Sequence, residues 1–159
     1  MVINLEQLEQ CRASLPQPVG LCLGCFDLVH SGHIEHFLLS RQQCNTLIVS
    51  VTPDQYVFKG PGRPYFNQKD RARIIDAIRC VDYVLCDNWE NDRTGMTAIR
   101  HIKPDMFFKG SEYALVSKKP GTDICDEVSL VESFGGKTRF VSGKIFSSTK
   151  ILSELEVKK

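Results

Sequence analysis

One stretch decides the fold: Gly24-Cys25-Phe26-Asp27-Leu28-Val29-His30-Ser31-Gly32-His33. It follows an apolar run, Val19 to Leu23, and precedes a segment with helical spacing, so we expect it to join a first buried strand to a first helix. Backbone N–H groups at a helix start are unpaired, and the helix dipole adds positive potential there. With His30 and His33 as additional donors and only Gly32 close between them, the stretch is predicted to bind phosphate.

The composition is that of one ordinary domain. The chain has 159 residues, 42% of them hydrophobic, so we expect a single domain over residues 1–159, with residues 1–18 as an N-terminal helical extension. The formal net charge is only +1, whereas proteins that bind nucleic acid or an anionic membrane mainly through electrostatic attraction carry a large positive charge. We therefore expect neither kind of partner. Neither a membrane-spanning apolar run nor a signal-peptide pattern is present, and we expect a cytoplasmic protein.

The seven cysteines are odd in number and lie within apolar segments, which is typical of a reducing compartment. Cys22 and Cys25 form a C-x-x-C pattern, which can indicate a redox pair. Their odd spacing at the end of a strand sends the two side chains to opposite faces. Packing cysteines are therefore favoured over a redox pair.

Apolar strands alternate with helical segments along the chain. The predicted strands cover residues 19–24, 46–51, 82–86, 105–108 and 137–141. The predicted helices cover residues 4–15, 31–44, a segment capped by Asn67, 94–102, 126–134 and a last segment from Ser147, whereas residues 111–125 predict no element. This alternation predicts an α/β fold, a Rossmann-like doubly wound parallel five-stranded sheet in the order 3-2-1-4-5 with helices on both faces.

Ligands of such a sheet bind beyond the carboxyl ends of the first and fourth strands, where the winding reverses. That edge brings Lys109-Gly110, after the fourth strand, next to the stretch that ends at His33. The loop after the second strand, with Lys59 and Arg63, opens onto the same edge, as does Ser147-Ser148-Thr149 at the last helix.

Several motifs resemble one family. The pattern G-x-F-D-x-x-H-x-G-H over residues 24–33 resembles the signature of the cytidylyltransferase-like nucleotidyltransferases, and Ser147-Ser148-Thr149-Lys150-Ile151 resembles their terminal motif. The nearest resemblance is to the heptose-1-phosphate adenylyltransferase of ADP-heptose synthesis, and the next is to glycerol-3-phosphate cytidylyltransferase. The nearest resemblance is carried by Lys59-Gly60-Pro61-Gly62-Arg63-Pro64, Arg71, Val81-Asp82-Tyr83-Val84 and Pro104-Asp105.

Ser111-Glu112-Tyr113 stands where the heptose enzymes usually have Gly-Asp-Tyr, and residues 114–134 are longer than the corresponding stretch of those enzymes. Both departures lie near the expected acceptor site. The resemblance therefore supports the reaction better than it supports the acceptor.

The resemblance implies transfer of a nucleoside monophosphate from a nucleoside triphosphate, with ATP favoured, to a small phosphorylated acceptor such as a sugar phosphate, with release of pyrophosphate. CTP with glycerol 3-phosphate, or a similar phosphate or phosphonate, is the alternative. Catalytic roles are implied for His30, His33 and Lys59, and acceptor or pyrophosphate contacts for Arg63 and Arg71. Nucleotide contacts are implied for Gly24, Cys25, Phe26, Gly32, Lys109, Gly110, Ser147, Ser148 and Thr149. Mg²⁺ is expected to bridge phosphates without a metal-binding set of protein residues, and a homodimer is expected from the family.

Other interpretations of the same residues stay open. The two histidines alone can serve as a helix cap, and Cys25, His30, His33 and His36 together resemble a zinc set. Asp27 is expected to brace its turn rather than act as an acid. For the whole chain, the contrasting class is a non-catalytic, nucleotide-binding regulatory domain.

Overall fold

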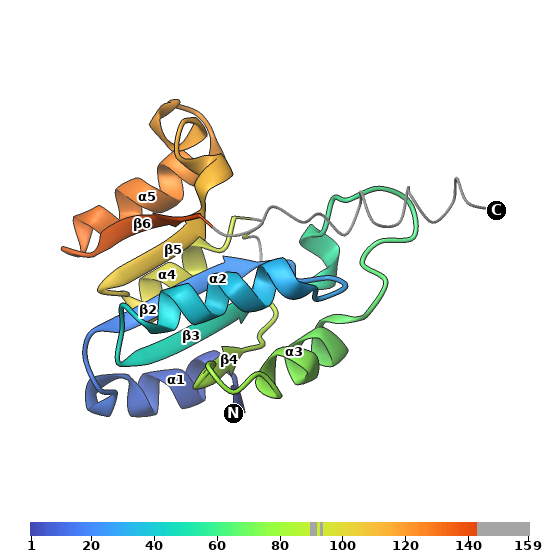
Figure 1. Cartoon of the computed structure of the whole chain (residues 1–159), viewed down its shortest axis with the longest axis horizontal. Helices are drawn as coiled ribbons and strands as arrows, with labels where there is room; N and C mark the ends of the chain where they lie inside the picture. The colour runs from blue at the N-terminus through green and yellow to red at the C-terminus, as the bar shows by residue number, and fades with distance from the viewer. Residues whose placement is uncertain (90–91, 93, 143–159) are drawn as a thin grey trace.

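A parallel β-sheet forms the centre of the computed structural model, which describes residues 1–89, 92 and 94–142 (Figure 1). Within these residues the sheet has six strands in the order β1-β4-β3-β2-β5-β6, and each neighbouring pair is parallel. The strands are β1 (Val2–Ile3), β2 (Val19–Gly24), β3 (Thr46–Val51), β4 (Tyr83–Leu85), β5 (Met106–Gly110) and β6 (Lys137–Val141).

The predicted order of the strands is confirmed, but the predicted number is wrong. The five expected strands are β4-β3-β2-β5-β6, in that spatial order, and β1 adds a sixth at the edge beside β4. A strand of two residues is too short to show an alternating pattern in the sequence. Ile3, which is 3% exposed, belongs to β1 and packs into the core. The segment before residue 19 is consequently part strand and part helix.

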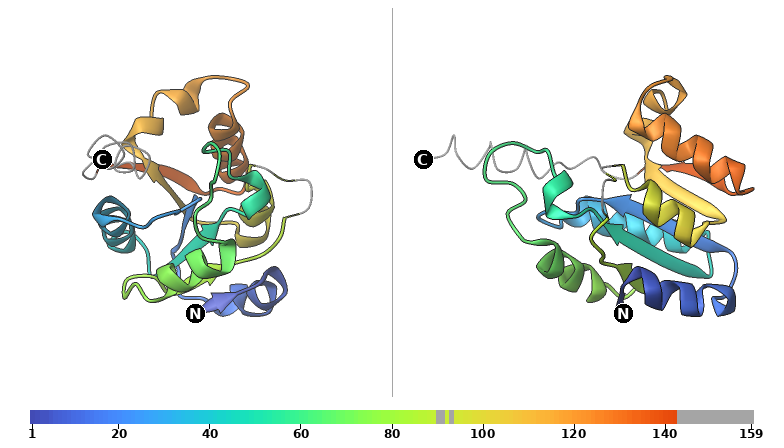
Figure 2. Two further views of the ribbon diagram at one scale, coloured as in Figure 1. Left: turned by 90° about the vertical axis from the view of Figure 1, so that its right-hand side faces the viewer. Right: turned by 180° about the vertical axis from the view of Figure 1, so that it is seen from behind.

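Helices cover both faces of the sheet, as predicted (Figures 1 and 2). On one face lie α1 (Leu5–Cys11), α4 (Met96–Ile102) and α5 (Asp123–Ser133), and on the other lie α2 (Ser31–Arg41) and α3 (Gln68–Asp76). None of the helices in the described part of the chain is long and apolar enough to cross a membrane.

Alternating side chains of the central strands supply a core on each face. Leu21 of β2 and Phe107 of β5 belong to the core beneath α1, α4 and α5, whereas Cys22 and Phe108 belong to the core beneath α2 and α3. Adjacent residues of a strand point to opposite faces. Both faces of these strands are therefore buried, which explains their continuous apolar sequence.

The helix boundaries follow from local capping. Asn67 caps α3 as predicted, since its side chain accepts a hydrogen bond from the Asp70 N–H at 2.9 Å. Thr122 caps α5, which begins at Asp123 rather than at the predicted residue 126. Short 3₁₀ helices η3 (Ser111–Tyr113) and η4 (Val116–Lys118) occupy the stretch where no element was expected. The predicted helix from Ser147 lies outside the described residues.

The winding reverses at β2, which lies between β3 and β5. The connection from β2 to β3 runs through α2 on one face, and the connection from β4 to β5 runs through α4 on the other. Cys22 of β2 is paired with Phe108 of β5, so the residues that follow these two positions leave the sheet side by side. The ligand site predicted from the sequence lies at this edge, beyond the carboxyl ends of β2 and β5.

Two neighbouring residues of α2 test this packing. Phe37 is fully buried, whereas Leu38 is 48% exposed. Replacing Phe37 by Ala leaves a cavity, and we expect it to lower the free energy of unfolding by about 3–5 kcal/mol. The matched variant Leu38→Ala is expected to change it by less than about 0.5 kcal/mol. Denaturant titration of both variants measures the difference, and equal losses would contradict the described orientation of α2.

Candidate active site

The turn between β2 and α2 has a constrained backbone. Phe26 and Leu28 have φ angles of 50° and 57°, in the left-handed region that side chains other than glycine rarely adopt. Such conformations persist where the surrounding structure over-determines them, and they concentrate at functional sites. The turn ends at His30, which precedes the first residue of α2. The quoted stretch thus places the start of α2, where His30 and His33 also cap each other's backbone N–H groups, at the carboxyl end of β2.

His30 and His33 form a stacked pair at this helix start. Their ring centroids are 3.8 Å apart and the ring planes differ by 19°. The His30 N–H donates to Nδ1 of His33 at 3.4 Å, and the Phe26 ring meets the His33 ring edge-on at 5.5 Å. Because Nδ1 of His33 accepts a hydrogen bond, a neutral His33 ring carries its proton on Nε2. That N–H is the donor that His33 can offer to a ligand.

The pKa values of His30, His33 and His36 all lie below the ordinary value. Burial lowers the pKa of His33 to about 3, and the nearby His30 and Lys59 act in the same direction. Burial, followed by the charge of Lys59, also lowers the pKa of His30. His36, one turn further along α2, has its pKa lowered to about 4 by burial and by the charge of Lys109. The fixed positive charge of the site therefore comes from lysines that lie near the rings.

Asp27 ties the β2–α2 turn to the loop after β3. Its fully buried carboxylate accepts from Arg63 Nε at 2.5 Å and from the N–H groups of Tyr65 and Phe66 at 3.0–3.2 Å. Burial by itself raises the pKa of Asp27, but these hydrogen bonds and the Arg63 charge bring the pKa below its ordinary value. Asp27 is thus a brace, as expected from the sequence.

Arg71 makes a second connection between the same loops. Its guanidinium is fully buried and donates to the carbonyl oxygens of Cys25, Thr52 and Phe66, and it forms an ion pair with Asp54 at 2.6 Å. The contact with an acceptor or pyrophosphate that the resemblance implied for Arg71 is therefore not available in this structure. Arg63 is likewise engaged with Asp27, so the two arginines hold the walls of the site.

Lys109 and Gly110 end β5, the strand next to β2. Lys109 Nζ lies 2.6 Å from Glu127 Oε2 of α5, and both side chains are largely buried. A Cβ atom at Gly110 would meet the carboxylate of Glu112, so a larger residue there would require the Glu112 side chain to move. No motif in the sequence indicates Glu127, which lies in a helix with no phosphate-binding pattern.

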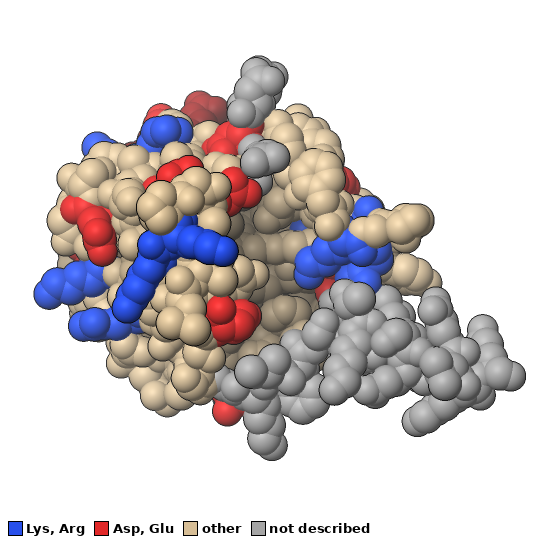
Figure 3. Space-filling view, turned by 90° about the horizontal axis from the view of Figure 1, so that it is seen from above, with Lys and Arg blue, Asp and Glu red and all other residues tan. Residues whose placement is uncertain are grey.

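The structure therefore gathers most of the predicted site at one edge of the sheet. The segment 24–33 lies at the end of β2, Lys109 and Gly110 lie at the end of the neighbouring β5, and Lys59 is near enough to lower the pKa of both histidines. From above, the surface is hollowed, and Lys and Arg side chains lie on both sides of the hollow (Figure 3). Ser147, Ser148 and Thr149 lie outside the described residues.

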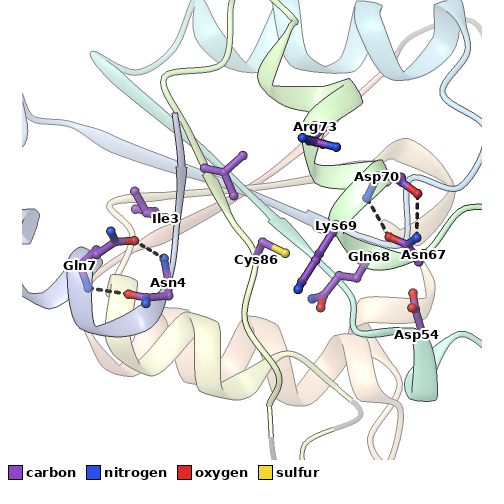
Figure 4. A pocket seen from close by; sticks show the side chains of 11 residues that line it. Ile3, Asn4, Gln7, Asp54, Asn67, Gln68, Lys69, Asp70, Arg73 and Cys86 are labelled. Atoms are coloured by element: carbon purple, nitrogen blue, oxygen red, sulfur yellow. Dashed lines mark hydrogen bonds between the residues drawn. The ribbon is translucent and has the colours of Figure 1, made fainter.

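A cavity of about 850 Å³ lies elsewhere, between β1 and the first turns of α3 (Figure 4). Two pairs of its polar residues bond to each other. Asn4 and Gln7 exchange hydrogen bonds, and Asn67 bonds to Asp70. In the described part of the chain, no group of three or more His, Cys, Asp or Glu side chains is arranged to hold a metal ion, and this includes the set around Cys25 and His36.

The buried brace predicts a pH dependence of stability. At pH 7 we expect Asp27→Asn to lower the free energy of unfolding by about 1–3 kcal/mol. The reason is that the neutral amide has one acceptor oxygen for donors that the carboxylate binds with two. Since the folded-state pKa of Asp27 lies below its ordinary value of 3.8, the stabilisation is present above pH 3.8 and is lost as the pH falls through the folded-state pKa. The difference between wild type and variant should therefore shrink at acid pH. Urea titrations between pH 7 and pH 3 measure this, with the exposed Asp126→Asn as control. A difference as large at pH 3 as at pH 7 would contradict the brace.

Bifunctional HldE proteins match most of this chain in sequence. A bifunctional protein HldE from Pseudomonas syringae pv. tomato is 32% identical over 159 residues, a match that covers 96% of this chain and 31% of the relative. Another, from Mesorhizobium japonicum, is 36% identical over 126 residues and is matched over 76% of this chain and 25% of its own length. The chain thus spans less than a third of the length of these relatives.

Solved structures share the fold. A lipopolysaccharide core biosynthesis protein from Thermoplasma volcanium superposes with a TM-score of 0.58 at 22% identity, over 81% of this chain and 98% of the other. A pantoate-beta-alanine ligase from Francisella tularensis superposes with a TM-score of 0.63 at 16% identity, over 99% of this chain and 77% of the other. The profile of the cytidylyltransferase-like family matches residues 21–153, which include the whole β2–α2 turn and β5. The chain therefore belongs to the cytidylyltransferase-like family.

Proposed function

We propose that this chain is a nucleotidyltransferase that moves a nucleoside monophosphate from a triphosphate, preferably ATP, to a small phosphorylated acceptor such as a sugar phosphate. One observation carries the proposal: the stacked, neutral His30–His33 pair lies at the start of α2, at the reversal point of the sheet, with Lys59 near it. Family membership and the similarity to bifunctional HldE proteins support the reaction class. The preference for ATP rests on the Lys59 to Pro64 resemblance together with those relatives.

In the proposed reaction, an acceptor phosphate oxygen attacks the α-phosphorus of the triphosphate. A new O–P bond forms, the bond from the α-phosphorus to the bridging oxygen breaks, and pyrophosphate leaves with the electron pair. The acceptor oxygen is already anionic at neutral pH, so no residue has to remove a proton. The chain has to align the two substrates and offset the charge that builds up between them.

The described residues suit this task. The N–H groups at the start of α2 and the Nε2–H of His33 can donate to oxygens of the α-phosphate and the leaving group. Lys59, on an exposed loop beside the histidines, would supply positive charge over the same oxygens, and Lys109 would meet the nucleotide from the β5 side. Gly24, Cys25, Phe26, Gly32 and Gly110 shape the backbone of the proposed nucleotide site, and Ser147 to Thr149 complete it in the family pattern.

The proposal includes a Mg²⁺ ion that binds together with the triphosphate. The nearby Asp27 carboxylate is fully engaged with Arg63, Tyr65 and Phe66, so it has little left to offer a metal ion. A bound Mg²⁺ would be held mainly by phosphate oxygens and water and would offset their charge. A homodimer and a cytoplasmic location are further parts of the proposal, and light scattering in solution tests the first.

A matrix of substrates tests the function directly. The four nucleoside triphosphates are each mixed with heptose phosphate, other sugar phosphates, glycerol 3-phosphate and a phosphonate, and pyrophosphate release is measured. We expect the fastest release with ATP and a sugar phosphate. Equal or faster release with CTP would overturn the choice of base. Nucleotide binding without pyrophosphate release from any pair would favour the non-catalytic regulatory alternative.

Replacing His33 by Ala tests the proposed role of the pair. We expect kcat to fall by about a hundredfold or more, because a preorganised donor to the reacting phosphate is lost. The matched control is His101→Ala, which removes a partly exposed ring that pairs with Glu9 on α1, outside the proposed site. Steady-state kinetics and the melting temperature of both variants are compared. Wild-type turnover by a folded His33→Ala variant would remove His33 from the mechanism.

A further inference from the structure

Lys109 is held away from water at the carboxyl end of β5. Its Nζ atom lies 2.6 Å from Glu127 Oε2, and the two side chains are only 11% and 6% exposed. The same Nζ lies 5.0 Å from the centre of the Phe107 ring and 5.7 Å from the centre of the Tyr113 ring. A carboxylate from α5 and two aromatic rings thus surround the ammonium group.

The packing of α5 on the sheet does not require this ion pair. Ile124 and Val131 of the same helix are buried in the apolar core and attach α5 to the sheet. A buried ion pair adds little net stability compared with an apolar pair of similar size, because desolvation of both charges offsets their attraction. The placement of Glu127 therefore calls for an explanation other than stability.

The charges around the pair indicate what it does. Burial raises the pKa of Glu127, and Asp123 and Asp92 raise it further, whereas the Lys109 ammonium opposes this rise. The positive charge of Lys109 also lowers the pKa of His36 on α2, across the sheet edge. Lys109 follows Phe108, which pairs with Cys22 of β2, so Lys109 leaves the sheet beside the segment 24–33, and Glu127 fixes its ammonium there.

Building on the proposed function, we propose that Glu127 is a positioning residue that holds the Lys109 ammonium at one place on the crevice wall, where the ammonium meets the nucleoside triphosphate. Glu127 touches neither the substrate nor the reacting atoms and acts through Lys109. Its role extends the nucleotide site to α5, a helix without a phosphate-binding motif.

The variant Glu127→Gln tests this role. It keeps the size of the side chain and removes its charge, so the ammonium loses its fixed partner. We expect KM for the triphosphate to rise on the order of tenfold, as is usual when a group that orients a contacting residue is removed, with kcat nearly unchanged. Glu127→Asp, which restores a carboxylate on a shorter stem, should give an intermediate KM. The exposed Glu132→Gln on the same helix is the control and should behave as wild type.

A second variant separates positioning from stability. In the double variant Lys109→Met with Glu127→Met, the pair is replaced by apolar side chains, and we expect it to fold and to melt near the wild-type temperature. Its affinity for a non-hydrolysable ATP analogue, measured by calorimetry, should fall at least as far as that of Glu127→Gln. A lower melting temperature with unchanged KM and unchanged affinity would show a merely structural role and would overturn the proposal.

The same experiments distinguish this inference from the proposed function. If the wild-type chain binds the analogue but releases no pyrophosphate, the proposed reaction fails, and the calorimetric comparison still decides the role of Glu127. If the wild type turns over normally and Glu127→Gln matches it in KM and affinity, the reaction stands and the positioning role fails. A wild-type chain that binds none of the four triphosphates would overturn both.

Discussion

The fully buried carboxylate of Asp27 is the constraint on which the site depends. The β2–α2 turn carries two residues with positive φ, and such a backbone needs support from its surroundings. Asp27 supplies it by binding Arg63 and the backbone of the following loop, and Arg71 ties that loop to the carbonyl of Cys25. Two charges that look available in the sequence, those of Arg63 and Arg71, are therefore used to fix the geometry. The proposed ligand contacts accordingly fall to the histidines and the lysines.

This arrangement separates hydrogen bonding from charge. Burial and the nearby Lys59 charge lower the pKa of both His30 and His33, whose rings stack on each other, with Phe26 edge-on to His33, and so favour neutral rings. Neutral rings offer directional N–H donors at the start of α2, while the positive charge belongs to flexible side chains at the border of the crevice. The proposed transfer needs both alignment and charge neutralisation, and this division suits it.

The strand order, the two covered faces and the meeting of residues 24–33 with Lys109 were all predictable, because long apolar strands alternating with helices leave few topologies. The two-residue strand β1 was not predictable, because its pairing depends on tertiary packing of Ile3. The roles of the charged residues were the hardest to predict. In the sequence, Arg71 and Lys109 are both cations near a loop. In the structure, Arg71 donates to three carbonyl oxygens, whereas Lys109 forms an ion pair with Glu127. The ion-pair partners of these two cations, Asp54 and Glu127, lie far from them in the chain, so no short sequence pattern indicates the pairing.

The dispersal of the site along the chain has a thermodynamic consequence. The segment 24–33, Lys59 and Lys109 converge only when β2, β3 and β5 are in register, so the assembled crevice exists only in the folded chain. Any molecule that occupies the crevice therefore shifts the unfolding equilibrium of the whole sheet, by about 2.7 kcal/mol when its free concentration is a hundred times its Kd. The melting temperature of this protein is in effect a readout of what the crevice holds.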